Sequence, residues 1–169
     1  MNEVIIIVDM LKGFLQPGYP LFCGEKARRI IPFVAELLQK YSPEERIYVC
    51  DHHPPDDAEF KIFPPHCISG TEETKIIYEL VSCPGIIVPK TRYSGFYKTD
   101  LEGKLEKLVP KRVTVVGVCT DICVMYTVAD LRNRDYRVWV PIKGVASFDE
   151  EAHLFALKHM QQVLGAEVN

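Results

Sequence analysis

The sequence of 169 residues lacks several features that would place it in a special class. No apolar run approaches the roughly 20 residues that a bilayer-spanning helix needs. Basic residues form no block and the formal net charge is −3, so neither a nucleic-acid nor a membrane partner is expected. The apolar stretch near the N-terminus has no basic lead-in and no small-residue cleavage site, which indicates a strand and not a signal peptide.

The cysteines also lack a recognisable pairing pattern. All six are scattered, with no C-x-x-C motif. Without a secretion signal, this arrangement argues against a disulfide framework and favours the reducing cytoplasm. The 47% apolar and 25% charged residues are ordinary globular composition, and the length suits one domain spanning residues 1–169.

Strand-like and helix-like patterns alternate along the chain. Strands are predicted at 4–8, 46–50, 86–88, 113–118 and 137–140. Helices are predicted at 26–39, 71–81, 100–108, 121–134 and 149–163. This alternation predicts an α/β fold with three αβα layers, in which helices cover both faces of a mostly parallel central sheet.

Reactive side chains follow four of these predicted strands. Asp9 follows the first strand, Asp51 and His53 follow the second, and Lys90 follows the third. Cys123 lies one tight turn after the strand at 113–118. Because ligands of open α/β sheets bind outside the carboxyl ends of the strands, we expect these groups to converge in one crevice.

Cys123 is the candidate nucleophile. Thr120 or Asp121 would cap the following helix, and the helix dipole would then favour a thiolate in its first turn. Each residue also has a structural alternative. Cys123 could be a small buried hydrophobic residue, Asp9 could cap a turn, and Lys90 could be a solvated surface residue. Their shared position at strand ends favours the catalytic interpretation.

A second group suits a metal ion. Asp51 and His53 are two residues apart, so in an extended segment they point to the same side, while His52 points away. His66 follows in the proline-stiffened loop FPPHC, and Glu59 is a weaker candidate for a fourth ligand. This mixed oxygen and nitrogen set accepts Zn, Mn or Fe and leaves positions open for water or substrate.

Several motifs together resemble one family. The segments VDMLKGF, DHH, FPPHCISGT, VPK, SGFYKTDLE, GVCTDICV and ASFDEEAH occur in the order found in the isochorismatase-like cysteine hydrolases. Within that superfamily the chain looks most like the nicotinamidases, which are also pyrazinamidases. The resemblance implies the isochorismatase-like (Rossmann-like) hydrolase fold. It also implies hydrolysis of nicotinamide to nicotinate and ammonia in NAD salvage.

The resemblance further implies roles for the strand-end residues. Cys123 would attack the carboxamide and form a thioester, Asp9 would carry the proton to the departing ammonia, and Lys90 would hold both by charge. A cis Val118–Cys119 peptide would direct the amides of Cys119 and Cys123 to the oxyanion. Water activated by Asp9 or by the metal would release the acid.

The resemblance also implies a ring-binding pocket beside the metal. One divalent ion, with zinc favoured over iron or manganese, would bind Asp51, His53 and His66 and orient the pyridine nitrogen. Phe14 and Phe63 would supply aromatic walls, and Tyr93 and Phe96 would close the pocket. Two positions depart from the family pattern. Cys119 replaces a common alanine and exposes a second thiol to oxidation, and Phe63 replaces a frequent tryptophan.

Other functions stay open at this point. The principal alternative is a family amidohydrolase acting on a ureido, carbamoyl or biuret-like amide. Isochorismatase chemistry would not need Cys123. A non-enzymatic domain would not need the complete catalytic triad of Asp9, Lys90 and Cys123. A redox pair of Cys119 and Cys123 lacks the C-x-x-C form. A structural zinc site would need a closed, thiolate-rich ligand set. The expected partner is a small-molecule amide, and a homo-oligomer is also considered.

Overall fold

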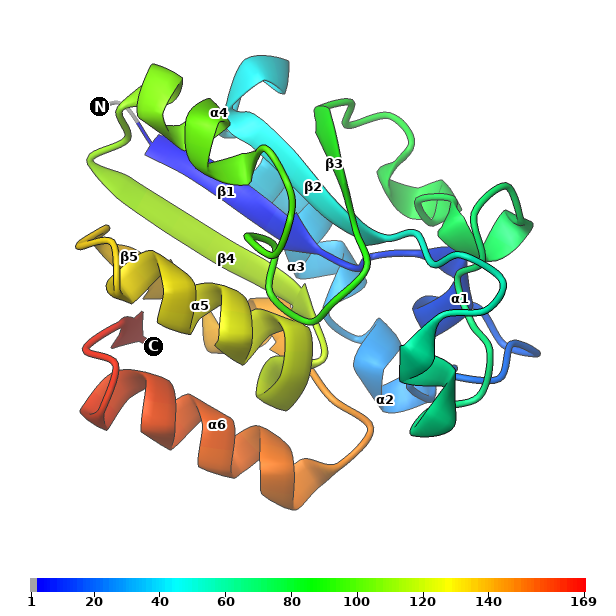
Figure 1. Cartoon of the computed structure of the whole chain (residues 1–169). Coiled ribbons are helices and arrows are strands. Elements are labelled where there is room, and N and C mark those ends of the chain that lie inside the picture. The colour runs from blue at the N-terminus through cyan, green and yellow to red at the C-terminus, as the bar shows by residue number, and fades with distance from the viewer. Residues whose placement is uncertain (1–2) are drawn as a thin grey trace.

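The computed structural model of the chain describes residues 3–169 and contains a parallel sheet with helices on both faces (Figure 1). The strands are β1 (Glu3–Val8), β2 (Arg46–Asp51), β3 (Ile86–Lys90), β4 (Arg112–Val118), β5 (Val138–Val140), β6 (Val145–Ala146) and β7 (Glu167–Val168). The α-helices are α1 (Lys12–Leu15), α2 (Glu25–Arg28), α3 (Ile31–Leu38), α4 (Leu101–Leu108), α5 (Met125–Arg132) and α6 (Glu150–Gln162).

The sheet has a reversal of strand order at its centre. Neighbouring strands follow the order β3-β2-β1-β4-β5-β7, β6 pairs with β4, and every paired strand runs parallel to its neighbour. From β1 the chain builds outward through β2 to β3, then returns to place β4 on the other side of β1. Ligands of such sheets bind at the carboxyl ends beside this reversal. The predicted α/β architecture is confirmed.

Two apolar layers hold the helices against the sheet. The β-branched run of β1 is buried throughout and sends alternate side chains to opposite faces. On one face Ile5 and Ile7 join a cluster with Val34 of α3. On the other face β1 joins a cluster that includes α4, α5 and α6, which lie in front of the sheet in Figure 1.

The predicted helix at 26–39 is divided in two. α2 ends at Arg28 and α3 begins at Ile31, with Pro32 in its first turn. Proline has no backbone N–H, so Pro32 cannot donate to the carbonyl of Arg28 and continue one helix through this point. Proline is well tolerated in a first turn, so the sequence restarts the helix there.

The predicted helix at 71–81 is wrong. Two short 3-10 helices, Glu72–Thr74 and Tyr78–Leu80, flank an extended stretch. In that stretch Ile76 forms an antiparallel bridge with Leu11, and the amide of Ile77 donates to the Met10 carbonyl at 3.1 Å. These bonds to the segment after β1 replace the helical bonds that were predicted over 71–81.

The helix predicted at 121–134 starts differently from the expectation. Thr120–Val124 form a π-helical turn that leads into α5. The carbonyl of Cys119 accepts the amides of Ile122 and Val124, and no side chain caps the turn. The predicted cap by Thr120 or Asp121 is therefore wrong. The two-residue strands β6 and β7 were not predicted, because two residues carry no detectable alternation.

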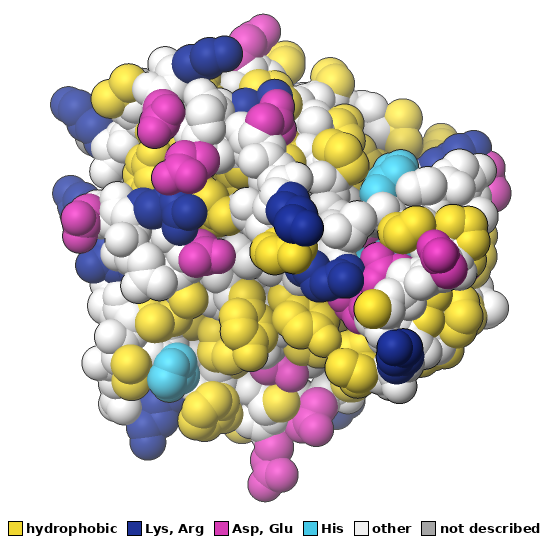
Figure 2. Space-filling view, viewed as in Figure 1, with side chains coloured by type: hydrophobic (Ala, Val, Ile, Leu, Met, Phe, Trp, Pro, Cys, Tyr) yellow, Lys and Arg dark blue, Asp and Glu magenta, His cyan; other side chains and the backbone are white. Residues whose placement is uncertain are grey.

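The molecular surface has mixed charge and one apolar region. On the face shown in Figure 2, basic side chains are interspersed with acidic ones and do not form a block. Hydrophobic side chains gather there over α5 and α6, where Tyr126, Leu154 and Phe155 are exposed. The homo-oligomer stays a prediction. Within residues 3–169 no helix has the length and apolar character needed to cross a membrane.

A substitution at Gly117 tests how closely β4 must approach β1. Its φ is +119°, and an added Cβ would lie 2.0 Å from the Val8 carbonyl oxygen. We expect Gly117→Ala to lower the free energy of unfolding by about 2–4 kcal/mol, because both the backbone and the strand pair must shift. Gly103→Ala is the matched control, since it lies in α4 with open space around it. This control should stabilise the chain by about 0.5–1 kcal/mol. Equal urea midpoints for Gly117→Ala and the wild type would contradict the analysis.

Candidate active site

A buried lysine lies at the centre of the candidate site. Lys90 is 2% exposed, and its Nζ lies 2.8 Å from Asp9 Oδ2 and 3.5 Å from Cys123 Sγ. The same ammonium forms a short ion pair with Asp51. An oxygen of Asp9 lies within 4.8 Å of the Cys123 sulfur. The three side chains that were predicted to form a catalytic triad are therefore in one cluster.

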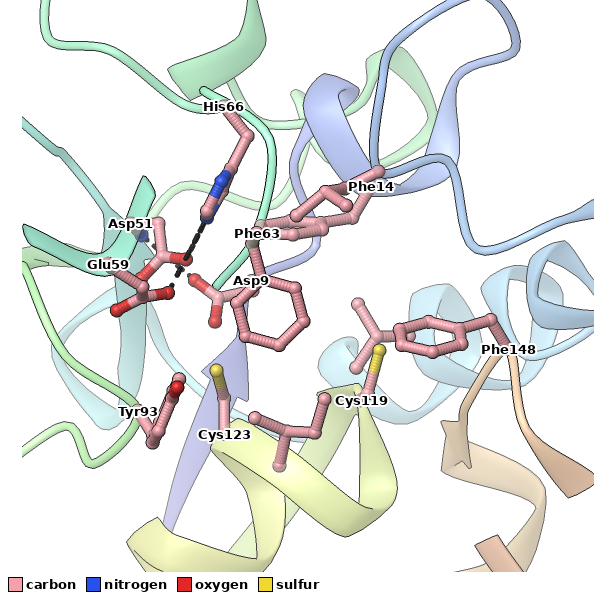
Figure 3. Close-up of a pocket in the computed structure, with 13 residues that line it drawn as sticks. Asp9, Phe14, Asp51, Glu59, Phe63, His66, Tyr93, Cys119, Cys123 and Phe148 are labelled. Carbon is pink, nitrogen blue, oxygen red and sulfur yellow. Dashed lines mark hydrogen bonds and ion pairs between the residues drawn. The ribbon is translucent and has the colours of Figure 1, made fainter. Parts of the chain in front are cut away.

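Each member reaches the cluster from a different strand end. Asp9 follows β1 with a φ of +49°, and one oxygen accepts the Asp51 amide at 2.8 Å. Lys90 ends β3, in register with Asp51 at the end of β2. Cys123 lies in the π-helical turn after β4, with its sulfur directed toward the Asp9 carboxylate (Figure 3). The reversal between β1 and β4 thus brings acid and thiol together.

Burial and charge act in opposite directions on these groups. Burial and the Asp51 charge raise the pKa of Asp9 to about 6, although Lys90 opposes them. Burial disfavours the Lys90 ammonium, but Asp51 and Asp9 outweigh it and hold the pKa of Lys90 above its usual range. Burial also raises the pKa of Cys123, so the predicted lowering by a helix dipole is not found. The pair starts as a thiol beside a base.

Cys119 has different surroundings from Cys123. Its sulfur lies 3.5 Å from the thiol of Cys23, and this neighbour together with burial raises the pKa of Cys119. The peptide bond between Val118 and Cys119 is cis, as the resemblance implied. In Figure 3 the Cys119 sulfur lies on the Phe148 side of the pocket, away from the carboxylates.

Four side chains form a possible metal site next to the triad. One ligand atom from each of Asp51, His53, Glu59 and His66 lies within 4.8 Å of the others. His53 Nε2 is 3.4 Å and His66 Nε2 is 3.7 Å from Asp51 Oδ2. Glu59, the weaker candidate from sequence, has Oε1 at 3.7 Å from His66 Nε2. Its position is equivalent to those of the three stronger candidates.

The chemistry of this donor set fits a divalent cation. His53 Nε2 and Glu59 Oε2 are buried without a hydrogen-bond partner. The other nitrogen of each histidine is engaged, His53 Nδ1 by Asp57 at 3.0 Å and His66 Nδ1 by the Pro64 carbonyl at 2.8 Å. Outer partners of this kind orient a metal-binding imidazole. A buried set of two carboxylates and two imidazoles needs positive charge, which a metal ion would supply.

His52 was predicted to point away from the metal candidates, and the structure agrees. His52 borders a surface depression with Cys50 and Ile87, outside the four-residue group. Alternation along the extended segment therefore separates the two adjacent histidines.

A pocket opens beside the two clusters, and its walls are mainly apolar (Figure 3). Phe14, Phe63 and Tyr93 line it, where the resemblance implied walls formed by Phe14 and Phe63 and closure by Tyr93. Phe96 does not line it. Its ring instead lies 4.3 Å from the guanidinium carbon of Arg134, in a separate surface groove. The expectation that Phe96 closes the pocket is wrong, because this contact directs its ring to the neighbouring α5 region.

Sequence reasoning missed part of the wall and one polar residue. Leu21, Ile122 and Phe148 also line the pocket. They come from loops and a turn whose spacing carries no periodic signal. Asp57 accepts from His53 and was not singled out, although its spacing of four residues from a candidate ligand could have indicated it.

Comparison with known proteins places this geometry in a family. Residues 3–168 match the isochorismatase domain. The chain therefore belongs to the isochorismatase family. Among solved structures, a pyrazinamidase/nicotinamidase from Streptococcus mutans has 32% sequence identity and a TM-score of 0.91, covering 99% of both chains.

Two further solved structures show that enzymes with different substrates are similar to this chain. A Pyrococcus horikoshii pyrazinamidase in complex with zinc has 29% identity and a TM-score of 0.91, over 100% of this chain and 99% of that chain. An N-carbamoylsarcosine amidase from Thermoplasma acidophilum has 29% identity and a TM-score of 0.88, over 100% and 96%. The chain is thus similar both to nicotinamidases and to an amidase of another substrate class.

The buried lysine predicts a large effect on stability. With chelator present, we expect Lys90→Met to lower the free energy of unfolding by about 3–5 kcal/mol, because Asp9 and Asp51 lose their shared counter-charge. Lys104→Met is the control, since Lys104 pairs with Asp100 at the surface, at 2.7 Å. That variant should change stability by less than about 1 kcal/mol. Urea unfolding gives both values, and similar losses for the two variants would contradict the central role of Lys90.

Proposed function

We propose that the chain is a nicotinamidase, a metal-dependent cysteine amidohydrolase that converts nicotinamide to nicotinate and ammonia in NAD salvage. The observation that carries this proposal is the opening of the Asp9–Lys90–Cys123 cluster into a pocket with aromatic walls. The similarity to nicotinamidases over nearly the whole chain supports the same substrate.

The charge of the pocket favours a neutral amide. Among the described residues that line it, none is a lysine or arginine. Its titratable polar side chains are acidic residues, His66, Tyr93 and the cysteines, and they lie on or beside the two clusters. No protein cation on the pocket wall would therefore pair with a substrate carboxylate, whereas the ring of nicotinamide would pack on Phe14 and Phe63.

The first half of the reaction uses all three members of the cluster. Asp9 accepts the thiol proton of Cys123 as the sulfur attacks the carboxamide carbon. Lys90, in contact with both groups, stabilises the thiolate that develops. Asp9 then gives the proton to the nitrogen, the C–N bond breaks, and ammonia leaves a thioester on Cys123. The pKa of Asp9, about 6, suits both accepting and returning this proton.

The second half returns the enzyme to its starting state. Asp9 removes a proton from a water molecule, whose oxygen attacks the thioester carbon. The C–S bond breaks, Asp9 returns the proton to the sulfur of Cys123, and the acid leaves and ionises to nicotinate in solvent. Backbone amides of Cys119 and Cys123 at the pocket wall are the proposed donors to the oxyanion in both halves.

The metal site has a positioning role in this proposal. Asp51, His53, Glu59 and His66 would hold one divalent ion, with zinc favoured and iron or manganese also compatible. When bound, the ion supplies a Lewis-acid contact for the ring nitrogen. The zinc in the similar Pyrococcus horikoshii pyrazinamidase supports this assignment.

A second function has one specific observation in its favour. The N-carbamoylsarcosine amidase is almost as similar to this chain as the pyrazinamidases are. The alternative is thus an amidohydrolase for a ureido, carbamoyl or biuret-like amide. The aromatic walls formed by Phe14 and Phe63 favour a ring substrate over the aliphatic members of this group.

Ammonia release with two substrates tests the function. We expect kcat/KM for nicotinamide to exceed that for N-carbamoylsarcosine by at least about 100-fold, because the carbamoyl substrate lacks a ring to bury against Phe14 and Phe63, which is worth about 3 kcal/mol. Cys123→Ala should abolish release, while Cys119→Ala should keep most of it, because only the sulfur of Cys123 contacts Lys90. Faster release from the carbamoyl substrate would favour the alternative. Equal losses from the two cysteine variants would contradict the assigned nucleophile.

Metal removal tests the second cluster. Dialysis against a chelator should abolish nicotinamide hydrolysis, and one equivalent of added Zn²⁺ should restore it, because the ring then regains its anchor. Ammonia release is the measurement, with circular dichroism as the control for an intact fold. Parallel additions of Fe²⁺ and Mn²⁺ identify the most effective ion. Full activity in metal-free protein would exclude metal dependence.

A further inference from the structure

Asp57 is a buried acidic residue that the proposed reaction does not use. It is 7% exposed and lies in the loop between two candidate metal ligands. Its Oδ2 lies 3.0 Å from His53 Nδ1, and its Oδ1 accepts the Glu59 amide at 2.9 Å. We propose that Asp57 is a positioning residue, which holds His53 and Glu59 in the orientations that one divalent ion requires. This inference rests on the proposed metal site.

The contact with His53 determines which ring nitrogen is free for a metal. An ionised carboxylate can only accept, so Asp57 requires a proton on Nδ1 and leaves the lone pair on Nε2. Nε2 faces Asp51 Oδ2 at 3.4 Å and has no hydrogen-bond partner. Asp57 thus selects the tautomer that can bind a cation beside Asp51.

The contact with Glu59 fixes the second ligand through the backbone. Asp57 is the N-cap of the 3-10 helix Ala58–Lys61, and Glu59 lies in its first turn. The cap therefore sets where the Glu59 side chain starts. From there Glu59 Oε1 reaches to 4.0 Å from His53 Nε2, so the two residues tied to Asp57 also face each other.

Only a carboxylate satisfies both contacts. His53 Nδ1 and the Glu59 amide each present a proton, and they approach different oxygens of Asp57. Arg92 adds a third donor to Oδ1 at 2.8 Å. An asparagine has one oxygen and one NH₂ group. It would either lose the cap of Glu59 or present NH₂ to His53, which selects the wrong tautomer for Nε2 binding.

The test compares metal affinity in Asp57→Asn with that in Asp56→Asn. Asp56 is the exposed neighbour in the same loop, so both variants remove the same charge. Metal-free wild type and variants are titrated with Zn²⁺ against a chromophoric chelator, and with Co²⁺ to record the ligand-field spectrum. We expect Asp57→Asn to weaken Zn²⁺ binding by about 10–100-fold and to change the Co²⁺ spectrum, as loss of an outer-shell partner does. Asp56→Asn should match the wild type in both.

The melting temperature of each metal-free protein separates positioning from folding. If Asp57→Asn does not fold, Asp57→Ser replaces it, because serine keeps an N-cap acceptor for Glu59 while it removes the acceptor for His53 and the ion pair with Arg92. Turnover at saturating Zn²⁺ should recover in part in the variant that folds. Wild-type affinity and spectrum in that variant would overturn the role of Asp57 and leave the metal site intact. Wild type that binds no divalent ion would instead overturn the metal part of the proposed function.

Discussion

The burial of Lys90 is the constraint on which the rest of the site depends. Two carboxylates and a thiol lie around one ammonium that is almost entirely removed from solvent. Either carboxylate alone in that position would take up a proton or unfold the strand ends, because an unpaired buried charge is costly. The lysine also links the two clusters, since Asp51 contacts it through one oxygen and faces the histidines with the other. A change at the metal candidates is therefore expected to reach the Asp9–Cys123 pair through Asp51.

The parallel sheet supplies this arrangement with little additional structure. Register places Lys90 directly beside Asp51, and the reversal of strand order places the end of β1 beside the turn after β4. The close approach of Gly117 to Val8 contributes to the same arrangement. Any side chain at 117 would push β4 away from Val8, the residue before Asp9. The fold thus fixes the distance between acid and thiol before any substrate is present.

The sequence was sufficient to predict the residues at the strand ends. It was not sufficient for segments whose conformation or role is determined by tertiary contacts. Asp9, Asp51, Lys90 and Cys123 were found because buried β-branched runs are easy to recognise and parallel strands end on one edge. The helix predicted at 71–81 was wrong because this segment bonds to the chain after β1, a partner that the local sequence cannot show. Asp57 was missed for a related reason: its function depends on which nitrogen of His53 it contacts. The wall residues Leu21 and Phe148 come from loops and became visible only in the folded chain.

The two cysteines that border the pocket show how neighbours, and not residue type, decide reactivity. Both are buried, and the pKa of both thiols is raised, at Cys119 by the Cys23 contact and by burial, and at Cys123 by burial. Cys123 has an ammonium at 3.5 Å that opposes this effect and an adjacent carboxylate able to accept its proton. Cys119 faces the thiol of Cys23 at the same distance, and this contact raises the pKa of Cys119. Deprotonation therefore has a local driving force at only one of the two sulfurs, although four residues separate them in the sequence.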